Sequence, residues 1–222
     1  MIFHQQLMPF ESDMRMIAYE TLLDGDFELA LREASLYFEG MNTVHITLRR
    51  LAQRLNDIGV DYVIADGMCL FRHGFQRVTR DVDVIVTREG LAQIHEQLEG
   101  RGYVKPFEAS KNLRDTETGV RIDFIISGQY PGEGKPGPIA FPIPSAVATE
   151  IEGVRYVDLV PFIELKLASG EASHRGQDLV DVQSLIRVRS LPRDFSEQLH
   201  SSLRDSYLLR WNDAQKAAQD DT

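Results

Sequence analysis

The stretch that decides the fold is Arg80-Asp81-Val82-Asp83-Val84-Ile85-Val86. Its β-branched residues are typical of a strand, and residues two apart along a strand point to the same face of a sheet. Asp81 and Asp83 are therefore expected to share one face. Two like charges held close together are costly unless a cation neutralises them, and hard oxygen ligands suit Mg²⁺. The pattern indicates a divalent metal site on a β-strand.

Two segments on either side extend this prediction. Upstream, the apolar run Tyr62–Ala65 predicts a strand, and Asp66-Gly67 turns the chain directly after it. Downstream, Val120–Ile126 predicts another strand, which carries a third acid, Asp123. If the two acidic strands pair, three carboxylates meet, as metal-dependent phosphoryl or nucleotidyl transfer requires. Asp123 is then the acid most suited to accept or orient the proton of an attacking hydroxyl.

Glycine at position 67 favours a phosphate-binding turn. Without a side chain, Gly67 lets phosphates approach the backbone closely, and a short helix opening there offers unpaired N–H groups. The alternative is that Gly67 serves only as a tight turn. His73 is expected to be a packed or capping residue and Cys69 a buried, inert one.

The remaining pattern predicts helices around these strands. Asp26 is expected to cap a helix that ends before Gly40, a second helix runs from about Asn42 to Gly59, and a weaker pattern predicts an earlier helix from Asp13 to Leu23. Strands and helices alternate through the middle of the chain, which favours an α/β architecture with a mixed sheet flanked by helices.

The helical patterns divide the chain into three parts. We expect an N-terminal helical extension at residues 1–43, an α/β core at residues 44–160 and a C-terminal helical region packing on the core at residues 161–222. Within the core, Glu152-Gly153 predicts a hairpin turn, and the Gly/Pro-dense segment Gln129–Pro138 predicts an exposed loop.

Composition narrows the class of protein. The chain has 222 residues, is 43% hydrophobic and 26% charged, and has a net charge of −10. The acidic balance argues against a broad basic face for duplex nucleic acid, although a narrow basic cleft remains compatible with it. A single cysteine excludes an internal disulfide, and we expect no membrane span, no signal peptide and a cytoplasmic location. The sequence does not indicate how many subunits assemble.

Tyr62–Gly74 followed by Arg77–Asp83 resembles the signature of the DNA polymerase β-like nucleotidyltransferase superfamily, and within it the small bacterial AbiEii-toxin-like branch. The helical tail of these proteins is matched here by Leu165-Lys166-Leu167, Arg175 and Asp178-Leu179-Val180-Asp181. The resemblance covers roughly residues 44–188, and together its motifs are fairly specific.

The resemblance implies a nucleoside triphosphate (NTP) and Mg²⁺ (or Mn²⁺) as ligands, with nucleotide transfer to a hydroxyl on RNA, protein or a small molecule. It makes Asp81, Asp83 and Asp123 the catalytic, metal-binding acids. On the nucleotide side it implies roles for Gly67, Arg77, Lys166, Asp178 and Asp181, with Lys166 facing the triphosphate. One departure is notable, because Asp66 stands where the family has the first glycine of its turn. A carboxylate there repels a triphosphate unless it points away or binds metal.

Plainer interpretations stay open. Asp123 could form a structural salt bridge with Arg121 or Arg80, Lys166 could extend along the edge of the core to solvent, and Arg77 could simply balance charge. The functional alternative is a catalytically degenerate binding or regulatory module of the same fold, resembling a toxin–antitoxin component. A metal-dependent phosphohydrolase is a more remote third hypothesis.

Overall fold

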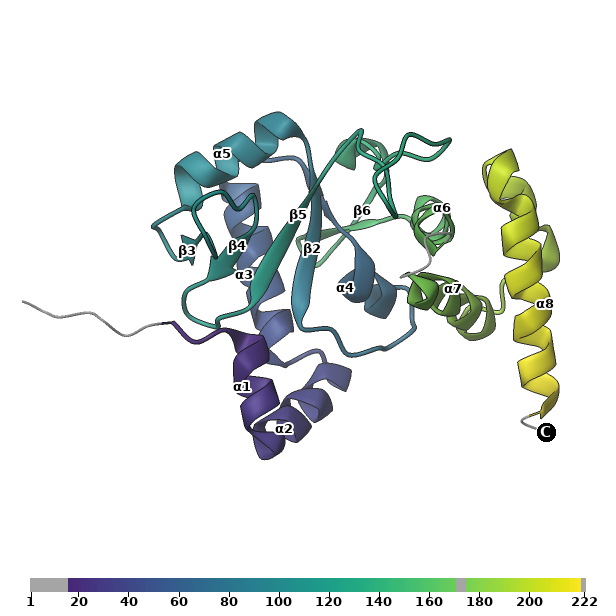
Figure 1. The fold of residues 1–222 in the computed structure, drawn as a ribbon, viewed down its shortest axis with the longest axis horizontal. Helices are drawn as coiled ribbons and strands as arrows, with labels where there is room; N and C mark the ends of the chain where they lie inside the picture. The colour runs from purple at the N-terminus through teal and green to yellow at the C-terminus, as the bar shows by residue number, and fades with distance from the viewer. Residues whose placement is uncertain (1–15, 171–174, 221–222) are drawn as a thin grey trace, which may run out of the picture.

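The computed structural model describes residues 16–170 and 175–220. In this part of the chain a seven-stranded sheet has the order β3-β4-β5-β2-β1-β7-β6 (Figure 1). The strands are β1 (Tyr62–Ile64), β2 (Asp81–Val86), β3 (Tyr103–Val104), β4 (Leu113–Asp115), β5 (Arg121–Ile126), β6 (Ala148–Ile151) and β7 (Val154–Val157). The β2–β5 and β1–β7 pairs are parallel and the other pairs antiparallel, so the predicted mixed α/β sheet is confirmed.

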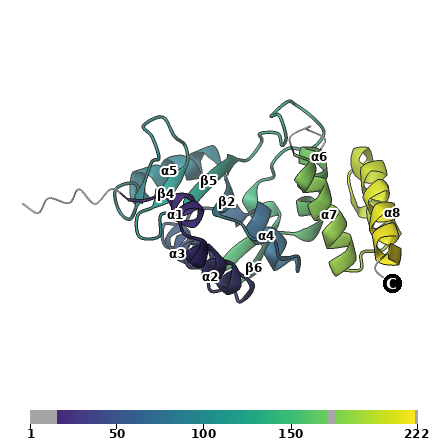
Figure 2. The same ribbon diagram turned by 60° about the horizontal axis from the view of Figure 1, so that its bottom comes forward.

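Helices cover both faces of the sheet. The α-helices are α1 (Tyr19–Gly25), α2 (Phe27–Phe38), α3 (Thr43–Asp57), α4 (Asp66–Arg72), α5 (Arg88–Leu98), α6 (Leu159–Gly170), α7 (Gly176–Val188) and α8 (Arg204–Asp220). Short 3₁₀ turns span Pro144–Ala146, Arg193–Gln198 and Ser201–Leu203. Figure 2 shows α8 outermost at one end of the molecule, with α6 and α7 between it and the sheet.

The alternation along β2 sorts its side chains between two cores. Val82, Val84 and Val86 are fully or almost fully buried in the core that α1, α2, α3 and α5 cover. Ile85 belongs to the second core, which α4, α6, α7 and α8 complete. Because side chains alternate along a strand, Asp81 and Asp83 lie on the same face as Ile85. The acidic face of the sheet is therefore the one that α6 and α7 cover.

Local signals in the sequence act as expected at several boundaries. Asp26 caps α2 by accepting a hydrogen bond from the Leu29 amide at 3.0 Å. Asn42 caps α3, accepting from the His45 amide at 3.1 Å. The predicted hairpin is confirmed, because Ile151 pairs with Val154 across a turn in which Glu152 and Gly153 both have positive φ.

Two sequence predictions differ from the structure. The helix expected at residues 13–23 instead begins at Tyr19, and residues 13–15 lie outside the described part of the chain. Strand β4 carried no recognisable signal, because Arg114 and Asp115 look like loop residues but are buried. Their charges are compensated by tertiary contacts: Arg114 donates to both carboxylate oxygens of Glu20 at 2.6 and 2.8 Å.

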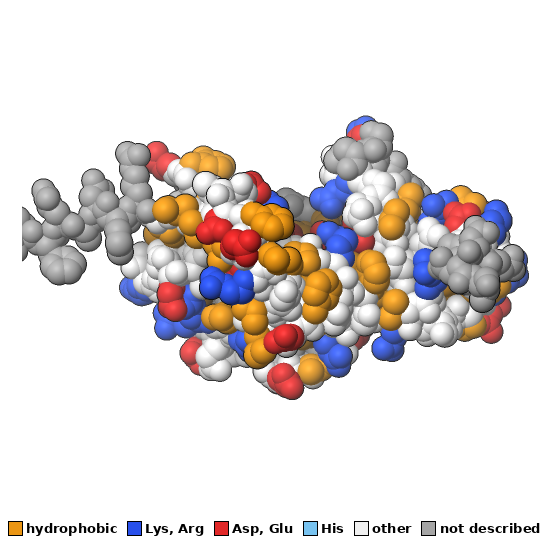
Figure 3. All heavy atoms as spheres, turned by 90° about the horizontal axis from the view of Figure 1, so that it is seen from below, with side chains coloured by type: hydrophobic (Ala, Val, Ile, Leu, Met, Phe, Trp, Pro, Cys, Tyr) orange, Lys and Arg blue, Asp and Glu red, His pale blue; other side chains and the backbone are white. Residues whose placement is uncertain are grey.

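One face of α2 is apolar and exposed. Phe27, Leu31 and Phe38 are 75%, 54% and 51% exposed, at a spacing that places them on one side of the helix. Figure 3, which views the molecule from below, shows hydrophobic side chains on the face to which α1 and α2 come forward. Among the helices that the structure describes, none has both the length and the apolar content to cross a lipid bilayer.

Candidate functional site

The three predicted acids come together through strand pairing. In the parallel ladder of β2 and β5, Asp83 lies directly opposite Asp123, and Asp81 lies opposite Arg121. Side chains at paired positions of neighbouring strands share a face and stand close together. Two chain segments 40 residues apart thus place Asp81, Asp83 and Asp123 on the α6–α7 side of the sheet, where the side chains of Asp81 and Asp123 are 25% and 24% exposed.

Arg121 bridges two of these carboxylates. Its Nη2 lies 2.8 Å from Asp81 Oδ2 and 3.1 Å from Asp123 Oδ2. Asp81 also accepts a hydrogen bond from the Thr79 hydroxyl at 2.8 Å. The salt bridge considered as the plain alternative for Asp123 is therefore present, with Arg121 as the partner. Its guanidinium neutralises part of the negative charge, and its side chain is 44% exposed, so it can move into solvent.

Asp83 and Asp123 are electrostatically unusual. Burial raises the pKa of Asp83 well above its ordinary value, and the charges of Asp66, Asp81 and Asp123 raise it further. Burial also raises the pKa of Asp123, against the opposing effect of Arg121. Asp123 Oδ1 is buried and has no hydrogen-bond partner within the described structure. A buried carboxylate oxygen without a donor is costly, so this site favours an added cation or proton.

Gly67 lies inside α4, because that helix begins at Asp66 rather than after the turn. A Cβ on Gly67 would come within 2.7 Å of Thr79 Cβ and 2.9 Å of its hydroxyl oxygen. The position therefore requires glycine for close packing against the segment that leads into β2. Asp66 has φ +42°, a left-handed conformation that is uncommon for a residue with a side chain.

Lys166 lies at the centre of a second cluster. Its Nζ donates to Asp178 Oδ1 at 2.8 Å, to Asp181 Oδ2 at 2.9 Å and, more closely, to Asp66 Oδ1. Lys166 is only 4% exposed, which sets aside the alternative that it reaches solvent along the core edge. Burial lowers the pKa of the ammonium, but the three carboxylates outweigh that effect and the net pKa is raised. Lys166 is thus a buried, permanently charged group.

Two arginines complete this cluster. Arg77 donates to Asp181 through Nε at 3.1 Å and Nη2 at 3.2 Å, and its Nη2 lies 3.6 Å from Asp66 Oδ1. Arg175 Nη1 lies 3.4 Å from Asp178 Oδ2. Three cations therefore match three carboxylates across α4, α6, α7 and the lead-in to β2, and Arg77 is at least a charge-balancing residue.

The closest set of acids differs from the set expected to bind metal. Oxygens of Asp66, Asp178 and Asp181 all lie within 4.8 Å of one another, and Lys166 Nζ donates to each of these residues. Over the described ranges, Asp81, Asp83 and Asp123 do not form so tight a set.

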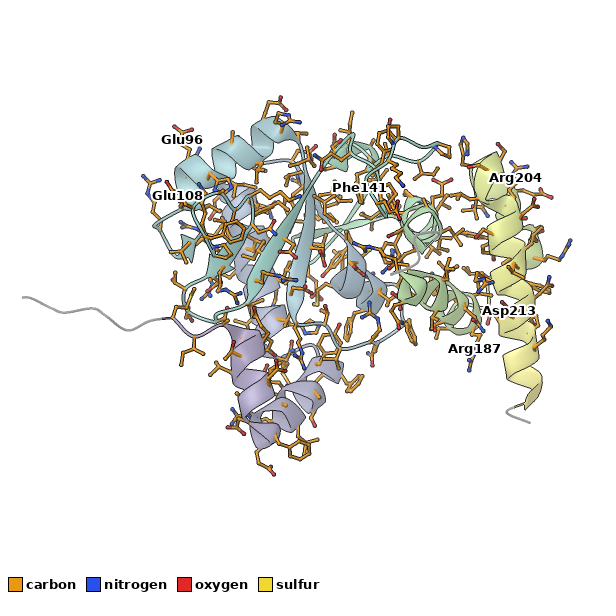
Figure 4. The ribbon with its side chains drawn as sticks, viewed as in Figure 1. Glu96, Glu108, Phe141, Arg187, Arg204 and Asp213 are labelled. Carbon is orange, nitrogen blue, oxygen red and sulfur yellow. The ribbon has the colours of Figure 1, made fainter. Side chains whose placement is uncertain are left out.

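A small cavity of about 70 Å³ connects the two clusters. Asp83 lines it from the strand side, and Asp66, Lys166, Arg175 and Asp178 line it from the helical side. Its remaining wall is largely apolar and includes Ile125, Phe141, Phe162 and Leu165. Figure 4 shows Phe141 on the sheet side of α6. The cavity places an apolar pocket beside three carboxylates that come from α4, β2 and α7.

Two parts of the site are not predicted from the sequence. Thr79 has no predicted role, although a threonine two residues before Asp81 continues the same strand-face spacing. Asp66 is predicted only as a departure from the family turn, and nothing in the sequence signals its contact with Lys166, 100 residues away. His73 is packed as expected: its ring stacks on Phe162 and its Nε2 lies 2.8 Å from the Val157 carbonyl oxygen. Cys69 is buried, as predicted.

Comparison with known proteins gives limited matches. No protein-family model matches the chain, and no curated protein does. Among solved structures, the chain is similar to ANT(2")-Ia in complex with adenylyl-2"-tobramycin, with 14% identity, 75% of this chain and 98% of that chain covered, and a TM-score of 0.48. It is also similar to an antigenic nucleotidyltransferase-like protein from Paracoccidioides brasiliensis, with 16% identity, coverage of 78% and 88%, and a TM-score of 0.45. Since both TM-scores are below 0.5, the proposals below rest on the residues of this chain.

Proposed function

We propose that this protein is a metal-dependent nucleotidyltransferase that moves a nucleoside monophosphate from an NTP to a hydroxyl acceptor. The observation that carries the proposal is the register of β2 against β5, which sets Asp83 opposite Asp123 with Asp81 on the same face. Neither strand alone supplies three carboxylates. Their pairing supplies the set that this chemistry uses.

Asp81, Asp83 and Asp123 are the proposed ligands of Mg²⁺ or Mn²⁺. The donors fit a hard divalent cation because all are carboxylate oxygens, and Asp123 Oδ1 is a buried acceptor without a donor in the described chain. When bound, the metal would supply positive charge to the reacting phosphate and to the hydroxyl oxygen. Arg121 would leave Asp81 and Asp123 to admit it.

Asp123 is also the proposed acceptor of the proton from the attacking hydroxyl. A general base works best when its pKa lies close to the working pH, and burial raises the pKa of Asp123 in that direction. It sits at the centre of β5, a strand held by pairing on both sides, so its position is fixed by the sheet.

The nucleotide is proposed to bind across the mouth of the cavity between the two clusters, because a cavity of about 70 Å³ is too small to enclose it. The apolar wall of the cavity, with Phe141 and Phe162, suits the base or sugar, and the phosphates would face Arg77, Lys166 and the start of α4 at Gly67. Asp178 and Asp181 act here by holding Lys166 in place. The acceptor is proposed to be RNA, protein or a small molecule. The proposed relation to the AbiEii-toxin-like branch rests on the sequence motifs, and the proposed cytoplasmic location rests on the single cysteine.

The test is transfer of labelled nucleotide. Purified protein is incubated with each α-labelled NTP, Mg²⁺ and cellular RNA, protein or metabolites. Asp81→Asn, Asp83→Asn and Asp123→Asn should each reduce labelling at least about 100-fold while the fold is retained. Asp213→Asn is the matched control: it removes an aspartate charge on α8, paired with Arg210 at 3.2 Å and remote from β2 and β5 (Figure 4). Unchanged labelling in the three site variants would refute the proposal.

A specific observation favours the second candidate, a binding or regulatory module without catalysis. Lys166 is already matched by three carboxylates, including Asp66, so its charge is not free for a triphosphate. Calorimetry separates the two functions. Micromolar binding of Mg²⁺–NTP supports the transferase, whereas no heat at millimolar nucleotide supports the binding module.

A further inference from the structure

Asp66 holds a conformation that its side chain makes costly. Its φ of +42° lies in the left-handed region, where glycine is favoured and asparagine and aspartate are the next most tolerated residues. The contacts of its carboxylate must therefore offset that strain. Those contacts are with two cations, Lys166 Nζ and Arg77 Nη2, the second at 3.6 Å.

Asp66 is the most exposed of the three carboxylates that contact Lys166. The side chains of Asp178 and Asp181 are 8% and 0% exposed, whereas that of Asp66 is 33% exposed. Lys166 itself is almost completely buried. An anion that approaches Lys166 from the side of Asp66 therefore meets the Asp66 carboxylate before it meets the ammonium group.

The opposite wall of the cavity is also acidic. Asp83 lines the cavity from the strand side and Asp66 from the helical side. A polyphosphate without a cation thus meets the Asp66 carboxylate, while the charge of Lys166 is already balanced. A polyphosphate with a bound divalent cation carries less negative charge and offers Asp66 a positive partner in place of Lys166.

We propose that Asp66 is a specificity-determining residue that excludes metal-free polyphosphates from Lys166 and admits them only with a divalent cation bound. The inference rests on the proposed function, because it places the phosphates of the nucleotide on the Lys166 side of the cavity. It assigns Asp66 a selective role: the residue decides which form of the substrate enters.

The experiment measures binding of inorganic tripolyphosphate by calorimetry, in EDTA and in excess Mg²⁺. Asp66→Asn removes the charge, keeps the shape and suits the positive φ, so the variant should fold. We expect it to bind tripolyphosphate in EDTA at least about tenfold more tightly than the wild type, and to show a smaller gain in Mg²⁺. Asp213→Asn, whose side chain is 31% exposed against 33% for Asp66, should leave both affinities unchanged.

The outcomes are decisive in either direction. The proposal is overturned if Asp66→Asn binds tripolyphosphate in EDTA no more tightly than the wild type does, or does not bind it. It is also overturned if the substitution raises the affinity by the same factor in EDTA and in Mg²⁺. Asp66→Gly, which is relaxed at φ +42°, repeats the test if the asparagine variant melts at a lower temperature. Because no turnover is measured, loss of the proposed transferase activity and loss of this selectivity are separate results.

Discussion

Gly67 packs directly against Thr79, and a Cβ on the glycine would lie 2.7 Å from the Cβ of the threonine. Thr79 in turn donates its hydroxyl hydrogen bond to Asp81. The first turn of α4 therefore sets the position of the segment that enters β2, and through Thr79 it orients the first acid of the site. This packing explains the glycine without reference to a ligand.

Gly67→Ala should destabilise the protein by about 1–3 kcal/mol, because an added methyl group in a closely packed interior forces the backbone to shift. Urea denaturation measures the change. Gly25→Ala is the control, since a Cβ on Gly25 meets nothing within 4 Å. Equal midpoints for Gly67→Ala and the wild type would show that the helix start adjusts freely and that the packing argument is wrong.

Arg121→Gln should raise the affinity for Mg²⁺ or Mn²⁺ by about 3–10-fold, because it removes a positive charge that lies 2.8 Å from Asp81 and 3.1 Å from Asp123. Titration calorimetry without nucleotide measures this. Arg155→Gln serves as the control, since Arg155 pairs with Asp61 and Glu150 instead. Weaker metal binding in Arg121→Gln would show that the cation does not bind between these carboxylates.

Lys166→Met should lower the free energy of unfolding by about 3–5 kcal/mol, because two almost fully buried carboxylates, Asp178 and Asp181, lose their shared ammonium partner. Lys135→Met, at a side chain that is 81% exposed, should change it by less than about 0.5 kcal/mol. Chemical denaturation compares the two variants. A Lys166→Met protein as stable as the wild type would contradict the compensated cluster described here.

His45 should make stability depend on pH. Burial lowers its pKa from 6.5 to about 4, with a smaller contribution from Arg49. Between these values the unfolded chain binds a proton that the folded chain does not. The stabilisation, roughly 3 kcal/mol, is complete above pH 6.5 and is lost as the pH falls toward 4. Unfolding of His45→Gln, followed from pH 7.5 to 4.5, should show a shallower decline than the wild type. Identical slopes would mean that His45 titrates normally.

The central strands of the sheet can be predicted from the sequence because the pattern that indicates them lies in neighbouring residues. β-Branched residues alternate through β2 and β5, and the acids on one face continue that alternation, so the strands and their shared face follow from spacing alone. Strand β4 cannot be predicted in this way, because its charged residues are buried through contacts with distant residues, such as that of Arg114 with Glu20 in α1. The pattern of neighbouring residues in the sequence does not indicate an ion pair between distant residues.

The candidate site shows the same limit. Spacing predicts that Asp81 and Asp83 face the same way, but only the parallel register against β5 places Asp123 opposite Asp83. Whether a lysine faces a ligand or a set of carboxylates depends on elements far apart in the sequence. Lys166 of α6 forms an ion pair with Asp66 of α4, 100 residues away in the sequence. The residue that departs from the family's glycine turn is therefore a partner of Lys166.

The pairing of β1 with β7 has a consequence for synthesis of the chain on the ribosome. One edge of the buried strand Tyr62–Ile64 can pair with β2 soon after synthesis. The other edge pairs with Val154–Val157, which emerges from the ribosome some 90 residues later. During that interval an apolar strand has an open hydrogen-bonding edge. Nascent chains halted between these segments should therefore be the form most prone to aggregate and the form most dependent on chaperones.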